Sequence, residues 1–311
     1  MLSHALVLTA GLGTRLRPLT DVRAKPAMPV AGEPMIRRIV RWLARNGVTD
    51  LVLNLHHRPD TVAAVVGDGS DLSASVRYSW EQPVALGSAG GPRLALPLVG
   101  ADRFLVVNGD TLTDVDLRAL AFAHETARAL VTLALVPNRE PHRYGGVGLD
   151  ADRRVRGFAP RGPAAERSYH FIGVQIVEAE VFRPLSAGQP ARSIGGLYDA
   201  LIAARPGTIR GCVSDARFWD VGTVSDYWAT SRGLTHAEAA PDVTCGRRVR
   251  LDPSARVTRS ILWDDVDVER GSVIDECVIT DRVRVPAGTT YRRMILLCTP
   301  DGTLRTSPLP L

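Results

Sequence analysis

The stretch that decides the fold is Ala10–Thr20, which reads AGLGTRLRPLT and follows a short apolar segment at His4–Thr9. A glycine-rich turn directly after a buried strand lets backbone N–H groups approach phosphate oxygens without interference from Cβ atoms. The dinucleotide fingerprint is excluded because Leu16 stands where its third glycine is required, and the P-loop is excluded because no Gly-Lys-Ser/Thr ends the turn. The stretch therefore predicts an α/β sheet whose first strand ends in a loop that binds phosphate.

The loop continues beyond Thr20 as a stiff and basic segment. Pro18, Pro26 and Pro29 restrict its backbone. Lys25 is the only lysine among 38 basic residues, and all the others are arginine. A lysine ammonium is a compact and mobile point charge, which suits a phosphate site where the planar guanidinium is bulkier. We therefore expect Arg15 and Lys25 to lie along a polyphosphate.

Residues 1–236 alternate short apolar segments with amphipathic ones, which indicates a layered α/β domain. The segment after it, 237–241, is rich in alanine and proline and reads as a linker. Strands are predicted at 4–9, 51–55, 104–107 and 129–136, with two or three more between 145 and 177, and helices at 34–46, 58–66, 116–126, 193–204 and 225–234.

Residues 237–311 have a different pattern, in which apolar side chains recur every sixth residue. A period of six is typical of a hexapeptide β-helix, whose short strands turn corners and stack on one another. An ordinary β-meander, with a period of two, is the alternative. Seven of the eight positions in this register are apolar, and the series runs Val243, Val249, Ala255, Ile261, Asp267, Val273, Ile279, Val285. The β-helix would have about three coils and a surface on which copies could stack.

Composition excludes several classes of protein. The chain has 311 residues, of which 45% are apolar and 23% charged, as in globular proteins. It has neither a secretory signal pattern nor a membrane-spanning run, so we expect a cytoplasmic protein without a membrane partner. Its four cysteines are far apart, which argues against a zinc site. The net charge is +5, but scattered arginines and 5% aromatic residues provide no platform for nucleic acid.

Several motifs together resemble the signature of the sugar-1-phosphate nucleotidylyltransferases, also called NDP-sugar pyrophosphorylases. The glycine-rich loop and its extension through Lys25-Pro26 to Ile36 resemble the family's first motif. Leu86–Gly91 resembles its nucleotide-base loop, Val107–Asp110 its metal-binding strand end, and Phe218–Thr223 its second metal segment. The hexapeptide region is similar to that of mannose-1-phosphate guanylyltransferases and glucose-1-phosphate adenylyltransferases.

The resemblance implies a fold, a reaction and a set of site residues. The fold would be a Rossmann-like three-layer domain with a mixed central sheet over residues 1–236, followed by a short left-handed β-helix over 237–311. The reaction would join an NTP and a sugar 1-phosphate with Mg²⁺ as cofactor. Implied catalytic residues are Arg15 and Lys25; nucleotide-binding residues Ala10, Gly11, Gly13, Thr14, Gln82, Gly87 and Ser88; sugar-phosphate-binding residues Asn108, Tyr144, Gly145, Arg161 and Gly173; and metal ligands Asp110 and Asp220.

One segment departs from the family pattern. The family usually carries Phe-x-Glu-Lys-Pro, whereas this chain has Phe158-Ala159-Pro160-Arg161-Gly162-Pro163. Arg161 keeps a cation at the lysine position, but Pro160 cannot accept a bond from a sugar hydroxyl. Three functions stay open: mannose-1-phosphate guanylyltransferase, which we favour, a UTP-dependent uridylyltransferase, and a regulatory subunit that senses nucleotide-sugar without turnover.

Other interpretations of the motifs are weaker. Asp110 alone could be explained by turn chemistry, and Asp220 alone by a cap. His56 and His57 lack a third metal ligand at useful spacing and are expected at a rim. A serine hydrolase is excluded because the Gly-x-Ser-x-Gly elbow is absent, and Ser88 is expected in a loop. Acyl transfer by the β-helix is excluded because none of the seven histidines lies there. We expect a homo-oligomer, a dimer or larger, formed through the β-helix. A chain ending after Leu234 should stay folded but change its oligomeric state or solubility.

Overall fold

The computed structural model describes residues 2–238 and 242–310, and residues 239–241 of the predicted linker lie outside this part. By compactness the chain divides into two units, one formed by Met1–Leu12 and Ile36–Trp219, the other by Gly13–Met35 and Asp220–Leu311. The cationic part of the glycine-rich loop therefore belongs to the same unit as the C-terminal strands, although more than two hundred residues separate them in sequence.

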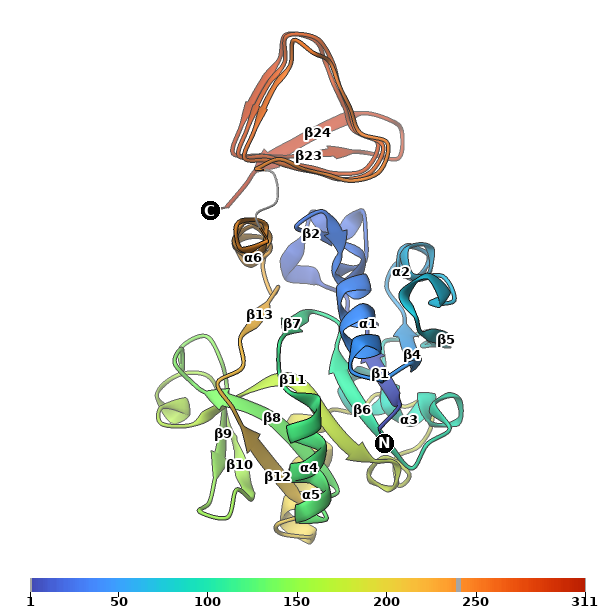
Figure 1. Cartoon of the computed structure of the whole chain (residues 1–311), viewed down its shortest axis with the longest axis vertical. Helices are drawn as coiled ribbons and strands as arrows, with labels where there is room; N and C mark the ends of the chain where they lie inside the picture. The colour runs from blue at the N-terminus through green and yellow to red at the C-terminus, as the bar shows by residue number, and fades with distance from the viewer. Residues whose placement is uncertain (1, 239–241, 311) are drawn as a thin grey trace. The chain divides into compact units, whose positions relative to one another are not determined.

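A mixed sheet of nine described strands forms the centre of the first unit (Figure 1). Strand β1 lies between β4 and β6 and runs parallel to both, and β11 is antiparallel to β6. The order along the sheet is β10-β9-β11-β6-β1-β4-β5, with β8 beside β11 and β12 beside β8. The bounds are β1 His4–Leu8, β4 Asp50–Leu55, β5 Ser75–Trp80, β6 Arg103–Asn108, β8 Val131–Pro137, β9 Gly146–Leu149, β10 Val155–Ala159, β11 Tyr169–Glu178 and β12 Ile209–Val213. The mixed central sheet expected from the sequence is confirmed.

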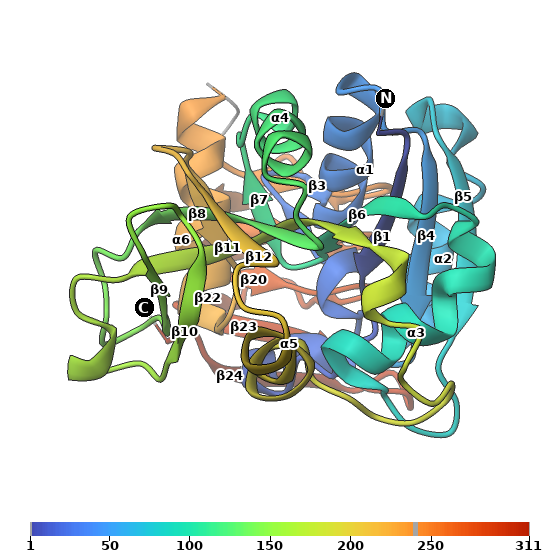
Figure 2. The ribbon, with the colours of Figure 1, turned by 90° about the horizontal axis from the view of Figure 1, so that it is seen from below.

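Helices cover both faces of this sheet, which makes three layers. Figure 2 shows α1 and α4 on one face and α3 and α5 on the other. Strands β1, β6 and β8 are mostly apolar and buried, as expected for strands that are covered on both faces. The helices are α1 Met35–Arg45, α2 Pro59–Val66, α3 Gly87–Val99, α4 Leu117–Ala127 and α5 Tyr198–Ala204, and the short strands β7 Thr111–Thr113 and β13 Phe218–Asp220 lie outside the central sheet.

Helix α3 corrects one prediction from the sequence. Residues 86–91 were expected to form a loop, and Ser88 with them, but Gly87 begins a helix of 13 residues that contains Pro92 and Pro97. Glycine and proline disfavour helix in isolation. Burial of the apolar face of α3 overrides that preference, because Ala89 and Ala95 are fully buried in the core.

The second unit contains the parallel β-helix, which Figure 1 shows along its axis, so that the coils overlie one another as a triangle. Its strands stack in three rows in which each strand is parallel to the one before, and β24 closes one row by pairing antiparallel with β23. This confirms the β-helix and rules out the meander. The bounds are β14 Thr244–Cys245, β15 Arg250–Leu251, β16 Arg256–Thr258, β17 Ile261–Leu262, β18 Asp267–Val268, β19 Val273–Asp275, β20 Val278–Ile279, β21 Arg284–Val285, β22 Thr290–Arg292, β23 Met294–Cys298 and β24 Leu304–Pro308.

The register of the β-helix differs from the predicted period of six. Ile261 pairs with Val278, so one coil takes 17 residues, and one of its three sides has five residues instead of six. The predicted series is therefore out of step after Ala255. This explains the one polar residue in that series, because Asp267 is only half-buried while its neighbour Val268 is 1% exposed in the apolar interior.

The rest of the second unit is the loop and one long helix. The loop contains three single-turn helices and a two-residue antiparallel hairpin, and α6 begins with Thr223 and Asp226 in a reciprocal capping box. The bounds are η1 Thr14–Leu16, η2 Leu19–Asp21, η3 Lys25–Ala27, β2 Pro29–Val30, β3 Glu33–Pro34 and α6 Val224–Ala237.

Candidate active site

In the first unit, predicted nucleotide and metal residues follow two neighbouring parallel strands. Ala10 and Gly11 come after β1, and Asn108 and Asp110 come at the end of β6. Leu8 and Asn108 are register partners, and the Gly109 amide donates to the Leu8 carbonyl at 2.9 Å. Because the strands are parallel, the start of the glycine-rich loop and Asp110 share the carboxyl edge of the sheet, where open α/β sheets bind their ligands.

Glu81, which the sequence analysis did not select, links chain segments at the same carboxyl edge of the sheet through hydrogen bonds. Glu81 is fully buried, and its side chain accepts bonds from Asn54 Nδ2 and from the Leu86 amide, each at 2.6 Å. Asn54 Oδ1 in turn accepts the Thr9 amide at 2.7 Å. The ends of β1, β4 and β5 are thus tied together, and Gln82, predicted at the base, directly follows this anchor. His56 also contacts it, with Nδ1 at 2.8 Å from the Glu81 carbonyl oxygen.

The amino end of α3 carries the predicted residues Gly87 and Ser88. Its amides at Ala89 and Gly90 donate to the Ala191 carbonyl at 3.0 and 3.2 Å, so that oxygen already satisfies them. Gly87 has a φ of +75°, and a Cβ there would lie 2.8 Å from the same oxygen. Glycine is therefore required for the close approach of the two chain segments.

The predicted sugar-phosphate residues gather around β11. Gly173, with a φ of +77°, packs so closely on Asn108 that a Cβ would come within 2.7 Å of its side chain. Three residues earlier, the His170 ring stacks beside Tyr144 with centroids 4.1 Å apart. A Cβ on Gly145 would lie 3.0 Å from the Ala159 carbonyl oxygen and 4.0 Å from the Arg161 amide. The structure thus brings Asn108 together with Gly173, and Tyr144 and Gly145 together with the segment of Arg161.

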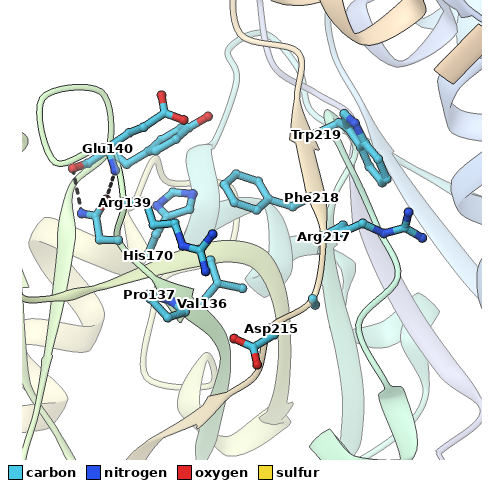
Figure 3. Close-up of a pocket in the computed structure, with 12 residues that line it drawn as sticks. Val136, Pro137, Arg139, Glu140, His170, Asp215, Arg217, Phe218 and Trp219 are labelled. Carbon is cyan, nitrogen blue, oxygen red and sulfur yellow. Dashed lines mark hydrogen bonds between the residues drawn. The ribbon is translucent and has the colours of Figure 1, made fainter. Parts of the chain in front are cut away.

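A cavity of about 380 Å³ opens beside this group (Figure 3). Its aromatic wall is formed by Tyr144, His170 and Phe218, whose ring centroids are 4.1 to 5.6 Å apart. Asn138 Nδ2 donates to the Tyr144 carbonyl at 3.3 Å and fixes the turn. The charged residues that line the cavity are two arginines, Arg139 and Arg217, and two acidic residues, Glu140 and Asp215. Tyr144 was expected near the sugar phosphate and Phe218 belongs to a segment singled out in the sequence, but the packing of their rings with His170 was not predicted, because the three residues come from separate segments.

The pKa of His170 is lowered to about 4, mainly because the ring is buried and also because Arg143 is near, and a backbone hydrogen bond at Gly145 opposes this in part. The ring is therefore neutral near pH 7. Between pH 6.5 and 4 the unfolded chain binds a proton that the folded chain rejects, so the free energy of unfolding falls as the pH is lowered through this window.

We expect His170→Phe to lessen this acid sensitivity. The variant keeps an aromatic ring between Tyr144 and Phe218 but removes the titration. Between pH 7 and pH 5 the wild type should lose up to about 2 kcal/mol more unfolding free energy than the variant. Chemical denaturation at both pH values measures the difference, and equal losses in the two proteins would contradict the depressed pKa.

In the second unit, the glycine-rich loop folds back on itself around Gly13. Gly13 has a φ of +61°, and a Cβ on it would lie 2.8 Å from Thr20 Cγ2 and 3.5 Å from Lys25 Cβ. The Thr20 hydroxyl donates to the Gly13 carbonyl at 3.0 Å. Thr14 and Arg15 form the single turn that follows. The first side-chain carbon of Lys25 therefore lies close to the backbone at Gly13.

The guanidinium of Arg15 and the carboxylate of Asp220 lie beside the same glycine. A Cβ on Gly222 would be 3.4 Å from Arg15 Nη2 and 3.3 Å from Asp220 Oδ2. It would also be 3.1 Å from Asp226 Oδ2, which caps α6. Two residues predicted from separate motifs, more than two hundred positions apart, thus converge within one unit.

Each unit contributes a carboxylate of the kind that suits Mg²⁺, which prefers carboxylate oxygens and usually keeps water or phosphate oxygens as further ligands. Asp220 presents a half-buried carboxylate next to the Arg15 guanidinium, and Asp110 follows a strand at the sheet edge. Within residues 2–238 and 242–310, no group of three or more His, Cys, Asp or Glu side chains is arranged to hold a metal ion.

Among the helices of these described ranges, none has the length and apolar character of a membrane-spanning helix.

Two known protein families match the chain over successive ranges. Residues 4–237 match the family model described as nucleotidyl transferase. Residues 238–293 match the model described as GlmU-like, C-terminal hexapeptide. The first match covers well over half of the chain.

Two curated proteins and one solved structure are also similar to this chain. The chain is 31% identical over 299 residues to a mannose-1-phosphate guanylyltransferase of Mycobacterium tuberculosis, covering 93% of this chain and 83% of the relative. It is 36% identical over 225 residues to an N-acetylmuramate alpha-1-phosphate uridylyltransferase of Neisseria meningitidis, covering 71% and 93%. The solved structure of HddC from Yersinia pseudotuberculosis matches with a TM-score of 0.64 at 22% identity, over 74% of this chain and 98% of that one, and shares the fold.

Proposed function

The chain belongs to the nucleotidyl transferase family, and from this premise we propose that it transfers a nucleotidyl group from an NTP to a sugar 1-phosphate. The products are an NDP-sugar and pyrophosphate. The observation that carries the proposal is the convergence of Arg15 and Asp220 beside Gly222, next to a loop that also holds the Lys25 stem. A cation and a carboxylate at one position suit a site that must bind both polyphosphate and a metal ion.

In this reaction an oxygen of the sugar phosphate attacks the α-phosphorus of the NTP, and the bond to the β,γ-diphosphate breaks. Repulsion between the two anions is the chief obstacle, so catalysis consists mostly of positioning and charge neutralisation. Arg15 would neutralise the departing pyrophosphate, and Lys25 would contact the phosphates as a point charge. Amides at Ala10, Gly11, Gly13 and Thr14 would donate to phosphate oxygens.

The remaining predicted residues would bind the base, the sugar and the metal. Gln82, Gly87 and Ser88 would lie against the base, and Asn108, Tyr144, Gly145, Arg161 and Gly173 against the sugar phosphate. Asp110 and Asp220 would hold Mg²⁺, which would neutralise phosphate charge and polarise the α-phosphoryl group.

For the substrates, we propose GTP and mannose 1-phosphate. The support is similarity over 93% of the chain, hexapeptide region included, to a relative with that name. UTP with another sugar phosphate is the alternative, supported by the higher identity to the N-acetylmuramate alpha-1-phosphate uridylyltransferase over a shorter stretch. A regulatory subunit that senses nucleotide-sugar is the third candidate, and Pro160 favours it because it removes an acceptor for sugar hydroxyls.

A turnover panel separates these candidates. Purified full-length chain is mixed with Mg²⁺, each of four NTPs and a set of sugar 1-phosphates that includes mannose, glucose and N-acetylmuramate, and pyrophosphate release is measured. We expect the highest kcat/KM with GTP and mannose 1-phosphate. A preference for UTP would select the uridylyltransferase. No release from any pair, with nucleotide-sugar still bound in calorimetry, would select the sensor.

The chain's organisation is part of the proposal. Residues 1–236 would carry the reaction, and the β-helix over 237–311 would mediate a homo-oligomer in the cytoplasm. The copy number in solution, measured by light scattering with size exclusion, tests the assembly.

A further inference from the structure

Arg23, within the glycine-rich loop, is an unusual buried arginine. It is 7% exposed, and its Nε and Nη2 donate to the two oxygens of Asp281, each at 2.6 Å. Nη2 also donates to Asp264 Oδ2 at 2.7 Å, and the guanidinium carbon lies 5.4 Å from the centre of the Trp263 ring. Burial by itself would lower the pKa of Arg23, but the bonds to Asp281 and Asp264 raise it overall, so the side chain stays charged.

Both carboxylates come from the β-helix and sit at one corner of it. Asp264 and Asp281 are 17 residues apart, which is one coil, and follow the paired strands β17 and β20. The Asp264 amide donates to Asp281 Oδ1 at 3.0 Å, so the two acids are locked to each other as well as to Arg23. Two stacked coils thus place two carboxylates together, and the Arg23 guanidinium binds both.

The loop is held at two backbone positions, one at the last residue of η3, which begins at Lys25, and one two residues further on. Arg23 Nη1 donates to the Ala27 carbonyl at 3.4 Å. The Tyr227 hydroxyl donates to the Pro29 carbonyl at 2.7 Å and itself accepts Trp263 Nε1 at 3.0 Å. Trp263 and Tyr227 are both fully buried. The segment that carries Lys25 is therefore fixed through Arg23 and through Tyr227, and both anchors reach the β-helix.

We propose that Arg23 is a positioning residue, which docks the loop carrying Lys25 onto Asp264 and Asp281 of the β-helix. The proposal rests on the phosphate-binding role proposed above for Lys25. The donors of Arg23 point to the β-helix and to Ala27, so its charge is engaged there instead of with a phosphate. An apolar pair of similar volume would stabilise a buried contact at lower desolvation cost. A directional ion pair adds a fixed geometry, and small displacements of a charge at a reacting phosphate lower the rate strongly.

The test compares Arg23→Gln with Arg259→Gln. Arg259 serves as a control because its guanidinium also donates twice to one aspartate, Asp275, at 2.7 and 2.8 Å, but this pair is half-exposed and joins two coils of the β-helix instead of the loop and the β-helix. We expect kcat of Arg23→Gln to fall about 10- to 100-fold while KM for the sugar phosphate changes less than about threefold. Arg23→Lys should recover part of kcat because it restores the charge without the two-pronged geometry. Arg259→Gln should keep wild-type kcat.

A second readout does not depend on turnover. Hydrogen exchange of the Ala27 and Met28 amides in the full chain should be at least about tenfold faster in Arg23→Gln than in Arg259→Gln. Equal kcat in the two variants, or equal exchange, would overturn the positioning role. A wild type that releases no pyrophosphate from any pair would refute the proposed function, and exchange would still decide the docking. If Arg23→Gln does not fold, Arg23→Lys and Asp281→Asn are judged by the same two measurements.

Discussion

Asp110→Asn is expected to lower kcat for Mg²⁺-dependent pyrophosphate release by at least about a thousandfold, because an amide is a weak ligand for a hard cation. The fold should be unaffected, since Asp110 follows β6 at the sheet edge and is not part of the apolar interior. Steady-state kinetics over a range of Mg²⁺ concentrations, with circular dichroism of the same preparations, measures both effects. Added Mg²⁺ should restore little of the lost rate.

Asp102→Asn is a suitable control for this experiment. Asp102 directly precedes β6 at the opposite edge of the sheet, and its exposed carboxylate pairs with Arg183 at 2.7 Å. Surface pairs of this kind contribute little to stability, so the control should retain wild-type kinetics. If Asp110→Asn kept its turnover, Asp110 would have no role as a metal ligand.

The local parts of the fold could be predicted because their signals are local. The segment 4–9 before the glycine-rich turn, the amphipathic segment 34–46 and the capped start of α6 each carry their own pattern within a few residues. Helix α3 could not be predicted, because its glycines and prolines oppose helix and its stability comes from core contacts, among them those of Ala89, Ala95 and Val99. The β-helix was found from its period, but the five-residue side that sets a 17-residue coil depends on stacking between coils.

The residues of the candidate site also fall into those that the sequence predicted and those that it did not. Arg15 and Asp220 were predicted from separate motifs, and the structure places both beside Gly222. Glu81 and Arg23 were missed, because an isolated charged residue in a sequence is usually solvent-exposed. Both side chains are buried and make hydrogen bonds to residues distant in sequence. Glu81 binds Asn54, and Arg23 binds Asp264 and Asp281. Only a structure brings those partners together.

A chain ending after Glu238 is expected to lose both stability and turnover, in contrast to the folded product expected from the sequence. The cut removes Asp264, Asp281 and Trp263, the β-helix residues that contact the loop and α6. Tyr227, fully buried in the whole chain, loses its ring contact with Trp263, and the backbone around Lys25 loses the Arg23 anchor. We expect the thermal midpoint to fall by more than about 5 °C and kcat by at least about a hundredfold.

A shorter truncation isolates the cause. A chain ending after Pro300 lacks β24 but keeps all three β-helix residues that contact the loop and α6. It exposes the edge of β23, so we expect strand pairing to alter its assembly or solubility, while its loop keeps the same anchors. We expect this chain to retain most of the wild-type kcat. Calorimetry, light scattering and pyrophosphate release on both truncations measure the difference. Full activity in the chain ending after Glu238 would mean that the glycine-rich loop adopts its active geometry without the β-helix.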